Sequence, residues 1–152
     1  MGLDNYPKIL PCVSEYGIIE TEGKGCKELA ECNKCPWANH FKDDFQDGIL
    51  GIFGTPCWFR GKSGNFMIER LCDSFDDLNF YGDSSGDGNG ELSPSYCETL
   101  ADFLSENEYE HMEAINGYDW SREDVQSELK AYAYAIKWLR FVAKYDGAMA
   151  WY

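Results

Sequence analysis

Apolar positions in residues 49–81 predict strands. They form four short apolar or alternating runs, separated by turns that contain Gly, Pro or Asp: 49–53, 57–60, 66–71 and 78–81. Short runs of this kind between turn residues are typical of β-structure. The two runs on either side of residues 61–65 predict a β-hairpin with a Gly-containing loop. We therefore expect a small antiparallel sheet in this part of the chain.

The later part of the chain has helical periodicity instead. Ser93 followed by Pro94 is a good helix start, because Ser caps the first turn and Pro is tolerated at the first helical position. A second helix is expected from Ser121, with Asp124 as its capping partner. Its core-facing stripe follows a 4-3-4-3-4 spacing: Val125, Leu129, Tyr132, Ile136, Leu139 and Ala143. Residues 94–146 are therefore predicted to hold two helices.

These patterns together predict the fold class. Residues 1–48 are expected to form an irregular Cys-rich segment, and residues 82–93 are expected to form a loop. A β-rich first half followed by two helices predicts an α+β fold, with the helices covering one face of the sheet. The chain has 152 residues, which suits one domain spanning 1–152.

Composition narrows the class of protein. An aromatic content of 16% is that of a folded chain. No stretch reaches the roughly 18 apolar residues of a membrane span, and the N-terminus has no secretory signal. Seven cysteines without such a signal favour metal ligation or burial over a disulfide framework. We expect a cytoplasmic protein without a membrane partner, and leave a homo-oligomer open.

The net charge of −14 is concentrated in one segment. Residues 71–119 contain 13 acidic residues and no Lys or Arg. Such a field repels nucleic acid and attracts basic protein surfaces or cations, although it can also serve only to keep the protein soluble. On the first predicted helix, Glu98, Asp102 and Glu106 recur every four residues, which places their carboxylates about 5–6 Å apart. This ladder is either a partner-binding edge or a solvated outer face.

Residues 58–66 are basic within this acidic chain and predict a ligand site. Alternation along a strand places Trp58 and Arg60 on one face, where the ring could stack on a base and the guanidinium could pair with phosphate. Backbone N–H groups of the Gly-rich turn could approach the same anion. The alternative is a hairpin with core aromatics and an Arg paired with a carboxylate. The candidate ligand-binding residues are Trp58, Arg60, Lys62, Asn65 and Arg70.

The cysteine spacing predicts a structural zinc site. Cys32 and Cys35 form a C-x-x-C pair, whose two sulfurs can bind one metal ion. Cys12 and Cys26 lie upstream and could complete a tetrahedron of four thiolates. Buried thiols and a redox pair are the alternatives. A closed site of this kind would stabilise the N-terminal segment and would not activate water.

Catalysis has little support in the sequence, so we expect a protein that is not an enzyme and has no catalytic cofactor. The chain contains two histidines and no H-E-x-x-H sequence. Paired carboxylates are too abundant in this chain to be informative. A binding role is therefore the expectation.

Three stretches resemble a loose group of short phage and bacterial proteins with no established activity. They are residues 1–6 (MGLDNY), residues 54–62 (GTPCWFRGK) and the final Trp-Tyr. The resemblance implies a phage or mobile-element origin and no particular site residue. Small phage proteins without catalytic motifs often inhibit host defence. We therefore expect a counter-defence protein of the host cytoplasm that sequesters a phosphate-bearing small molecule, such as a cyclic nucleotide or cyclic ADP-ribose-type signal. The alternative is an acidic DNA mimic, or an inhibitor of a basic host protein through residues 71–119.

Overall fold

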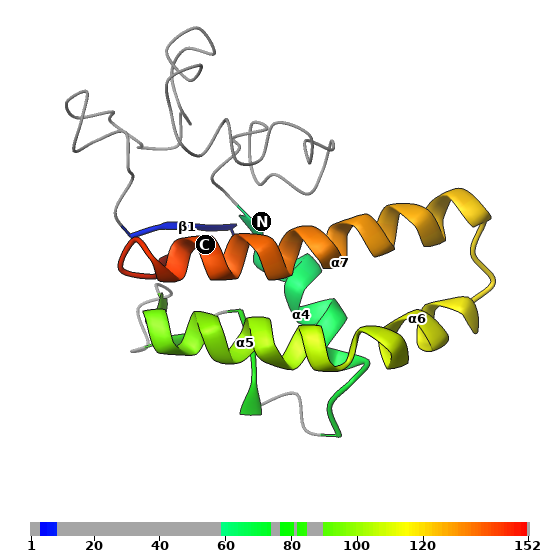
Figure 1. The fold of residues 1–152 in the computed structure, drawn as a ribbon, viewed down its shortest axis with the longest axis horizontal. Coiled ribbons are helices and arrows are strands. Elements are labelled where there is room, and N and C mark those ends of the chain that lie inside the picture. The colour runs from blue at the N-terminus through cyan, green and yellow to red at the C-terminus, as the bar shows by residue number, and fades with distance from the viewer. Residues whose placement is uncertain (1–3, 9–58, 74–76, 81, 85–89, 152) are drawn as a thin grey trace, which may run out of the picture.

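The computed structural model describes residues 4–8, 59–73, 77–80, 82–84 and 90–151, and it has the expected α+β fold. In Figure 1, α7 runs antiparallel along α5 and α6. No helix among these residues is long and apolar enough to cross a membrane. The elements in chain order are β1 (Asp4–Pro7), β2 (Phe59–Arg60), α4 (Gly61–Glu69), β3 (Asp83–Ser84), β4 (Gly90–Leu92), α5 (Pro94–Glu106), α6 (Glu108–Asn116), α7 (Arg122–Ala143) and β5 (Ala148–Trp151).

The described strands form one antiparallel sheet in the order β2-β1-β5-β4-β3. Strand β1 pairs with β2 on one side, where Asp4 lies opposite Arg60, and with β5 on the other, where Asn5 lies opposite Ala150. The predicted antiparallel sheet therefore exists, but it draws strands from both ends of the chain and not only from the first half. The loop expected over residues 82–93 contributes β3 and β4 to it.

The predicted hairpin around residues 61–65 is wrong, because Gly61–Glu69 forms helix α4. The buried positions Gly61, Gly64, Asn65 and Ile68 have the i, i+3, i+4, i+7 spacing of a helix face. Because two of these positions are glycines and one is an asparagine, a search for large apolar residues does not detect this face. The strand expected over residues 78–81 is also not formed in its described part, where residues 77–80 are a turn.

The C-terminal part contains three described helices where two were predicted. The predicted starts are confirmed: the Ser93 hydroxyl accepts a hydrogen bond from the Tyr96 amide at 3.2 Å, and the Ser121 hydroxyl accepts one from Asp124 at 3.1 Å. The additional helix follows a break at Asn107, whose side-chain amide donates to the Phe103 carbonyl at 2.8 Å and ends α5. Helix α6 then begins with acidic residues, which suit a helix N-terminus.

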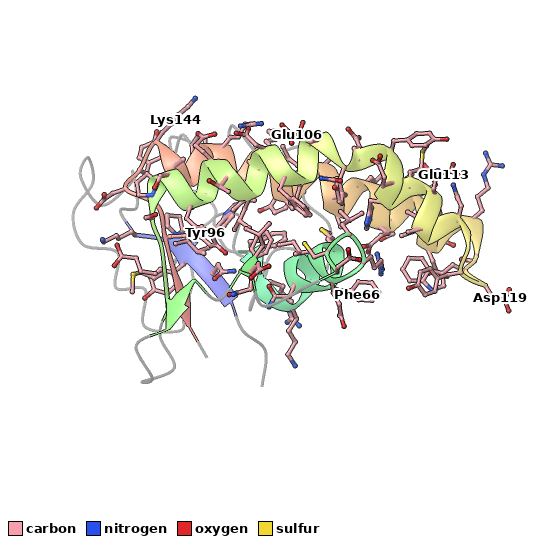
Figure 2. The ribbon with its side chains drawn as sticks, turned by 90° about the horizontal axis from the view of Figure 1, so that it is seen from below. Phe66, Tyr96, Glu106, Glu113, Asp119 and Lys144 are labelled. Atoms are coloured by element: carbon pink, nitrogen blue, oxygen red, sulfur yellow. The ribbon has the colours of Figure 1, made fainter. Side chains whose placement is uncertain are left out.

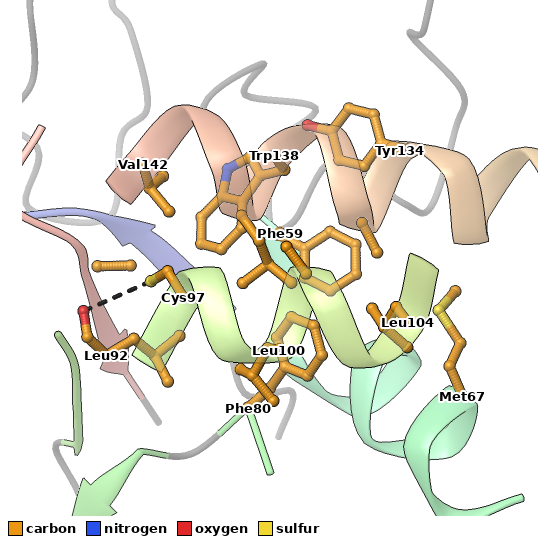
Figure 3. Packing of buried hydrophobic residues seen from close by; sticks show 14 of the residues in the cluster. Phe59, Met67, Phe80, Leu92, Cys97, Leu100, Leu104, Tyr134, Trp138 and Val142 are labelled. Atoms are coloured by element: carbon orange, nitrogen blue, oxygen red, sulfur yellow. Dashed lines mark hydrogen bonds between the residues drawn. The ribbon is translucent and has the colours of Figure 1, made fainter. Parts of the chain in front are cut away.

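The core lies between α5, α7, α4 and the sheet (Figure 3). Phe59 from β2 is at its centre, with ring centroids 5.1 Å from Phe80 and 5.5 Å from Trp138, distances typical of favourable aromatic pairs. The most buried stripe of α7 is shifted from the predicted one by one position, and consists of Ala131, Ala135, Trp138 and Val142. Of the predicted stripe, Tyr132 and Leu139 are buried and the other four positions are half-buried.

Candidate functional site

The first turn of α4 is the feature that most resembles an anion-binding site. The helix follows β2 directly, and Arg60 occupies the N-cap position without making a side-chain capping hydrogen bond. The first turn contains no acidic residue, and Lys62 within it is exposed. The first N–H groups of a helix have no intrahelical acceptor, and the helix dipole is positive at this end. This combination favours a bound anion.

The neighbouring candidate residues on β2 are only partly described. Arg60 is half-buried and opposite Asp4 in the sheet, whereas the adjacent Phe59 is fully buried in the core. Trp58 lies outside the described residues, so its predicted stacking role stays a prediction. Arg60 and Lys62 are therefore the two candidate ligand contacts that the structure brings together at one end of α4.

Asn65 is placed inside the fold. Its side chain is buried, and its Oδ1 atom accepts a hydrogen bond from the backbone N–H of Phe80 at 2.6 Å. A buried amide used in this way ties α4 to the turn that follows it. Asn65 therefore supports the helix from within and does not face an external ligand.

Arg70 lies at the opposite end of α4 from Lys62, about 12 Å away along a helix of this length. Its side chain is only 5% exposed, and its Nη1 atom donates to the Glu128 carboxylate at 3.1 Å. The guanidinium carbon lies 3.3 Å from the ring centroid of Phe66, with Tyr118 and Trp120 at 5.4 and 5.2 Å. Ion pairing and cation–π contacts thus hold Arg70 inside the protein, away from the Arg60–Lys62 site.

Arg70, Glu128 and His111 form one cluster of ionisable side chains, and His111 is the member that the sequence did not predict. The residue is fully buried on α6, its ring stacks on Tyr132 at 4.2 Å, and its Nε2 atom lies 3.5 Å from the Glu128 carboxylate. Burial alone would raise the pKa of Glu128, but the contacts with His111 and Arg70 outweigh it and lower that pKa. The only signal in the sequence was the spacing of His111 and Ile115, four residues apart, which are the buried residues of α6.

The predicted carboxylate ladder is only partly open to a partner. Glu98 and Asp102 both accept hydrogen bonds from Arg140 of α7, at 2.8 and 2.9 Å, whereas Glu106 is exposed. Three further exposed glutamates lie on α6, and Tyr109 among them is 64% exposed. Figure 2 shows Glu106 and Glu113 pointing outward from α5 and α6. The acidic edge thus continues from α5 onto α6.

The predicted zinc ligands Cys12, Cys26, Cys32 and Cys35 all lie outside the described residues. Within the described ranges, no group of three or more His, Cys, Asp or Glu side chains is arranged to bind a metal ion. Cys97 is buried, and its Sγ atom lies 3.6 Å from the Leu92 carbonyl oxygen (Figure 3). Burial raises the pKa of this thiol to about 12.

A cavity of about 510 Å³ lies beside the β3–β4 pair. Gly82, Glu91, Ser93 and Tyr96 line it among the described residues. Their polar groups have partners within the fold: Ser93 caps α5, the Tyr96 hydroxyl accepts from the backbone N–H of Asn79 at 3.0 Å, and Glu91 pairs with Lys8. These contacts fix the positions of the residues that line the cavity.

No protein-family model, curated protein or solved structure matches the chain. The resemblance to short phage and bacterial proteins therefore stays a prediction. Function has to be inferred from the chemistry of the described residues.

Proposed function

We propose that this protein binds and sequesters a phosphate-bearing small molecule, such as a cyclic nucleotide or cyclic ADP-ribose-type signal, without turning it over. The observation that supports the proposal is the first turn of α4, which has no side-chain cap and no acidic residue in a chain of net charge −14. Free N–H groups at a helix N-terminus are a common phosphate-binding arrangement. A counter-defence role of the phage type would follow from such sequestration.

The residues around this turn have separate roles in the proposed complex. The backbone N–H groups near Gly61 and Ser63 would donate to the phosphate oxygens, and the exposed Lys62 would add a positive charge. Arg60 would contribute a planar guanidinium, which suits bidentate pairing with phosphate. Asn65 and Arg70 would act indirectly, because their contacts with Phe80 and Glu128 fix the position of α4.

Calorimetric titration with a panel of cyclic nucleotides and cyclic ADP-ribose tests the proposal. We expect heat with at least one member, and affinity about tenfold weaker after Lys62→Gln, because a charged hydrogen bond to phosphate contributes about 1.5 kcal/mol. Lys130→Gln is the matched control, since Lys130 is an exposed lysine of α7. Absence of heat across the panel, or equal affinity in the two variants, would contradict the proposal.

A second candidate function is inhibition of a basic or DNA-binding host protein through residues 71–119. The observation that favours it is the exposed Tyr109 among the glutamates of α6, because a tyrosine among carboxylates suits a basic protein surface. Pull-down from host lysate would recover a basic partner whose binding weakens steeply with salt. Replacement of Glu106 and Glu113 by Lys should abolish recovery, and a small ultraviolet-absorbing ligand in place of a partner would favour sequestration.

A further inference from the structure

We infer that the outer side of an aromatic cluster, formed by Phe66, Tyr118 and Trp120, docks an arginine- or lysine-bearing segment of a basic partner protein. The cluster joins α4 to the connection between α6 and α7. This inference rests on the second candidate function, and it names the surface on which the partner's cationic side chains would sit.

The cluster concentrates the exposed aromatic surface of the described residues. Its ring centroids are 6.3 Å apart for Phe66 and Trp120, and 5.3 Å apart for Tyr118 and Trp120. Phe66 is 40% exposed and Tyr118 is 47% exposed. Tyr109 is the other large apolar side chain exposed among the described residues, and it has no ring contact within them. Grouped exposed aromatics of this kind mark an interaction surface more often than scattered ones do.

The chemistry of the cluster already suits a guanidinium. On the inner side, the Arg70 guanidinium carbon lies within 5.4 Å of all three ring centroids, and it is closest to Phe66 at 3.3 Å. Glu128 neutralises this inner cation. The exposed portions of Phe66 and Tyr118 therefore offer ring surface to a second cation, whose charge would be attracted by the ring quadrupoles.

Charges around the cluster favour a cationic occupant. Four exposed carboxylates lie next to it in sequence: Glu69, one turn along α4 from Phe66, Asp119 between the two loop aromatics, and Glu123 and Asp124 in the first turn of α7. Two exposed cations, Lys62 and Arg122, offset part of this negative charge. Figure 2 shows Asp119 on the connection between α6 and α7. A nucleic acid could stack bases on the same rings, but these carboxylates would repel its phosphates.

Fluorescence anisotropy of a labelled nona-arginine peptide at about 50 mM salt tests the inference, since charge interactions between exposed groups are only weakly screened there. We expect the wild-type protein to bind, and the double variant Phe66→Leu/Tyr118→Leu to bind about fivefold to tenfold more weakly, as two lost cation–π contacts would produce. Leucine keeps apolar bulk but has no ring. Tyr109→Leu is the matched control, and it should bind as the wild type does.

The outcomes separate the inference from the function on which it rests. If the wild-type protein does not bind the peptide, both fail. If it binds and the double variant binds equally well, or if Tyr109→Leu loses as much, the docking surface is wrong while an acidic binding protein survives. Tighter binding of a single-stranded oligonucleotide would also overturn it. Should the double variant unfold, Tyr118→Leu alone decides, because it leaves the contact between Phe66 and Arg70 intact, and about twofold to fivefold weakening is then expected.

Discussion

Buried ionisable side chains are the most consequential single residues of this protein. Arg70, His111 and Glu128 come from the end of α4, from α6 and from α7, and the Glu128 carboxylate lies 3.1 Å from Arg70 and 3.5 Å from His111. Removing one partner of a buried ion pair leaves an uncompensated charge, which is costly even where the intact pair adds little. These contacts therefore link the end of α4, α6 and α7 to one another.

Glu128 should make stability depend on pH. Its folded pKa is lowered from 4.5, because the contacts with His111 and Arg70 outweigh burial. A lowered carboxyl pKa contributes stability that is complete above the unfolded pKa and is lost as pH falls through the folded value. We expect the free energy of unfolding in urea to fall as the pH drops below about 5. Glu128→Gln should flatten this dependence and should cost about 3 kcal/mol of stability at pH 7.

Glu113→Gln is the control for this prediction, because Glu113 is exposed and lies on the same helix, α6, as His111. It should leave both the stability at neutral pH and its acid dependence near those of the wild type. Parallel pH profiles for Glu128→Gln and the wild-type protein would show that the carboxylate has no such role.

Cys97 should be unreactive in the folded protein. Its thiol is fully buried and its pKa is raised to about 12 by burial, so the nucleophilic thiolate is scarce at pH 8. A short iodoacetamide pulse followed by peptide mass mapping should show Cys97 modified only in denaturant. The half-buried Cys72 is the internal comparison and should react sooner. Equal labelling of both in the native state would contradict this prediction.

At the scale of elements, α4 shows how close packing can replace large side chains. Gly64 allows the helix to approach the Phe80 ring so closely that an added Cβ atom would lie 2.4 Å from it. The neighbouring Asn65 side chain bonds the backbone of Phe80. The Gly-rich sequence that suggested a turn is therefore a contact surface of a helix.

Gly64→Ala should destabilise the protein although alanine is the better helix former by about 1 kcal/mol. The added methyl group would displace a fully buried ring, and overpacking of this kind costs about 1–3 kcal/mol. Gly117→Ala provides the comparison, because Gly117 is exposed, has ordinary helical φ and ψ, and would place its Cβ 3.3 Å from the nearest atom. Thermal unfolding of the two variants measures the difference. Equal midpoints would rule out the packing explanation.

At the scale of the whole molecule, the sheet joins the two ends of the chain. Strand β5 lies between β1 and β4, so it connects the pair β1–β2 to the pair β4–β3. The turn before it contains Gly147 with φ of 85°, where an added Cβ atom would lie 2.1 Å from the Leu92 carbonyl oxygen. Without β5, the described strands would form two separate pairs, which are too small to be stable alone.

Truncation after Gly147 should therefore abolish cooperative unfolding. The variant would lose the buried Ala148 and every hydrogen bond that β5 makes to β1 and β4. Circular dichroism during heating should show a broad transition in place of a sharp, cooperative one. Truncation after Trp151 keeps all the described strand pairs and should unfold as the full chain does. A sharp transition in the shorter variant would mean that β5 is dispensable.

Zinc binding is a prediction about the part of the chain outside the described residues. If Cys12, Cys26, Cys32 and Cys35 bind one metal ion, elemental analysis should find about one zinc per chain. Chelation should then release the metal with little loss of helical circular dichroism, because the described helices contain none of these four cysteines. Zinc-free protein with the same stability would leave these residues as ordinary thiols.

Local interactions allowed the sequence by itself to determine the α+β class and the starts of α5 and α7. Ser93 and Ser121 form hydrogen bonds within the next three residues, and the stripe of α7 repeats along one helix, so both can be recognised without knowing the partner surface. Only the tertiary structure decided that residues 61–69 are helical and that Arg70 is enclosed. Both depend on residues far along the chain, Phe80 in one case and Glu128 in the other, because long-range contacts override weak local preferences.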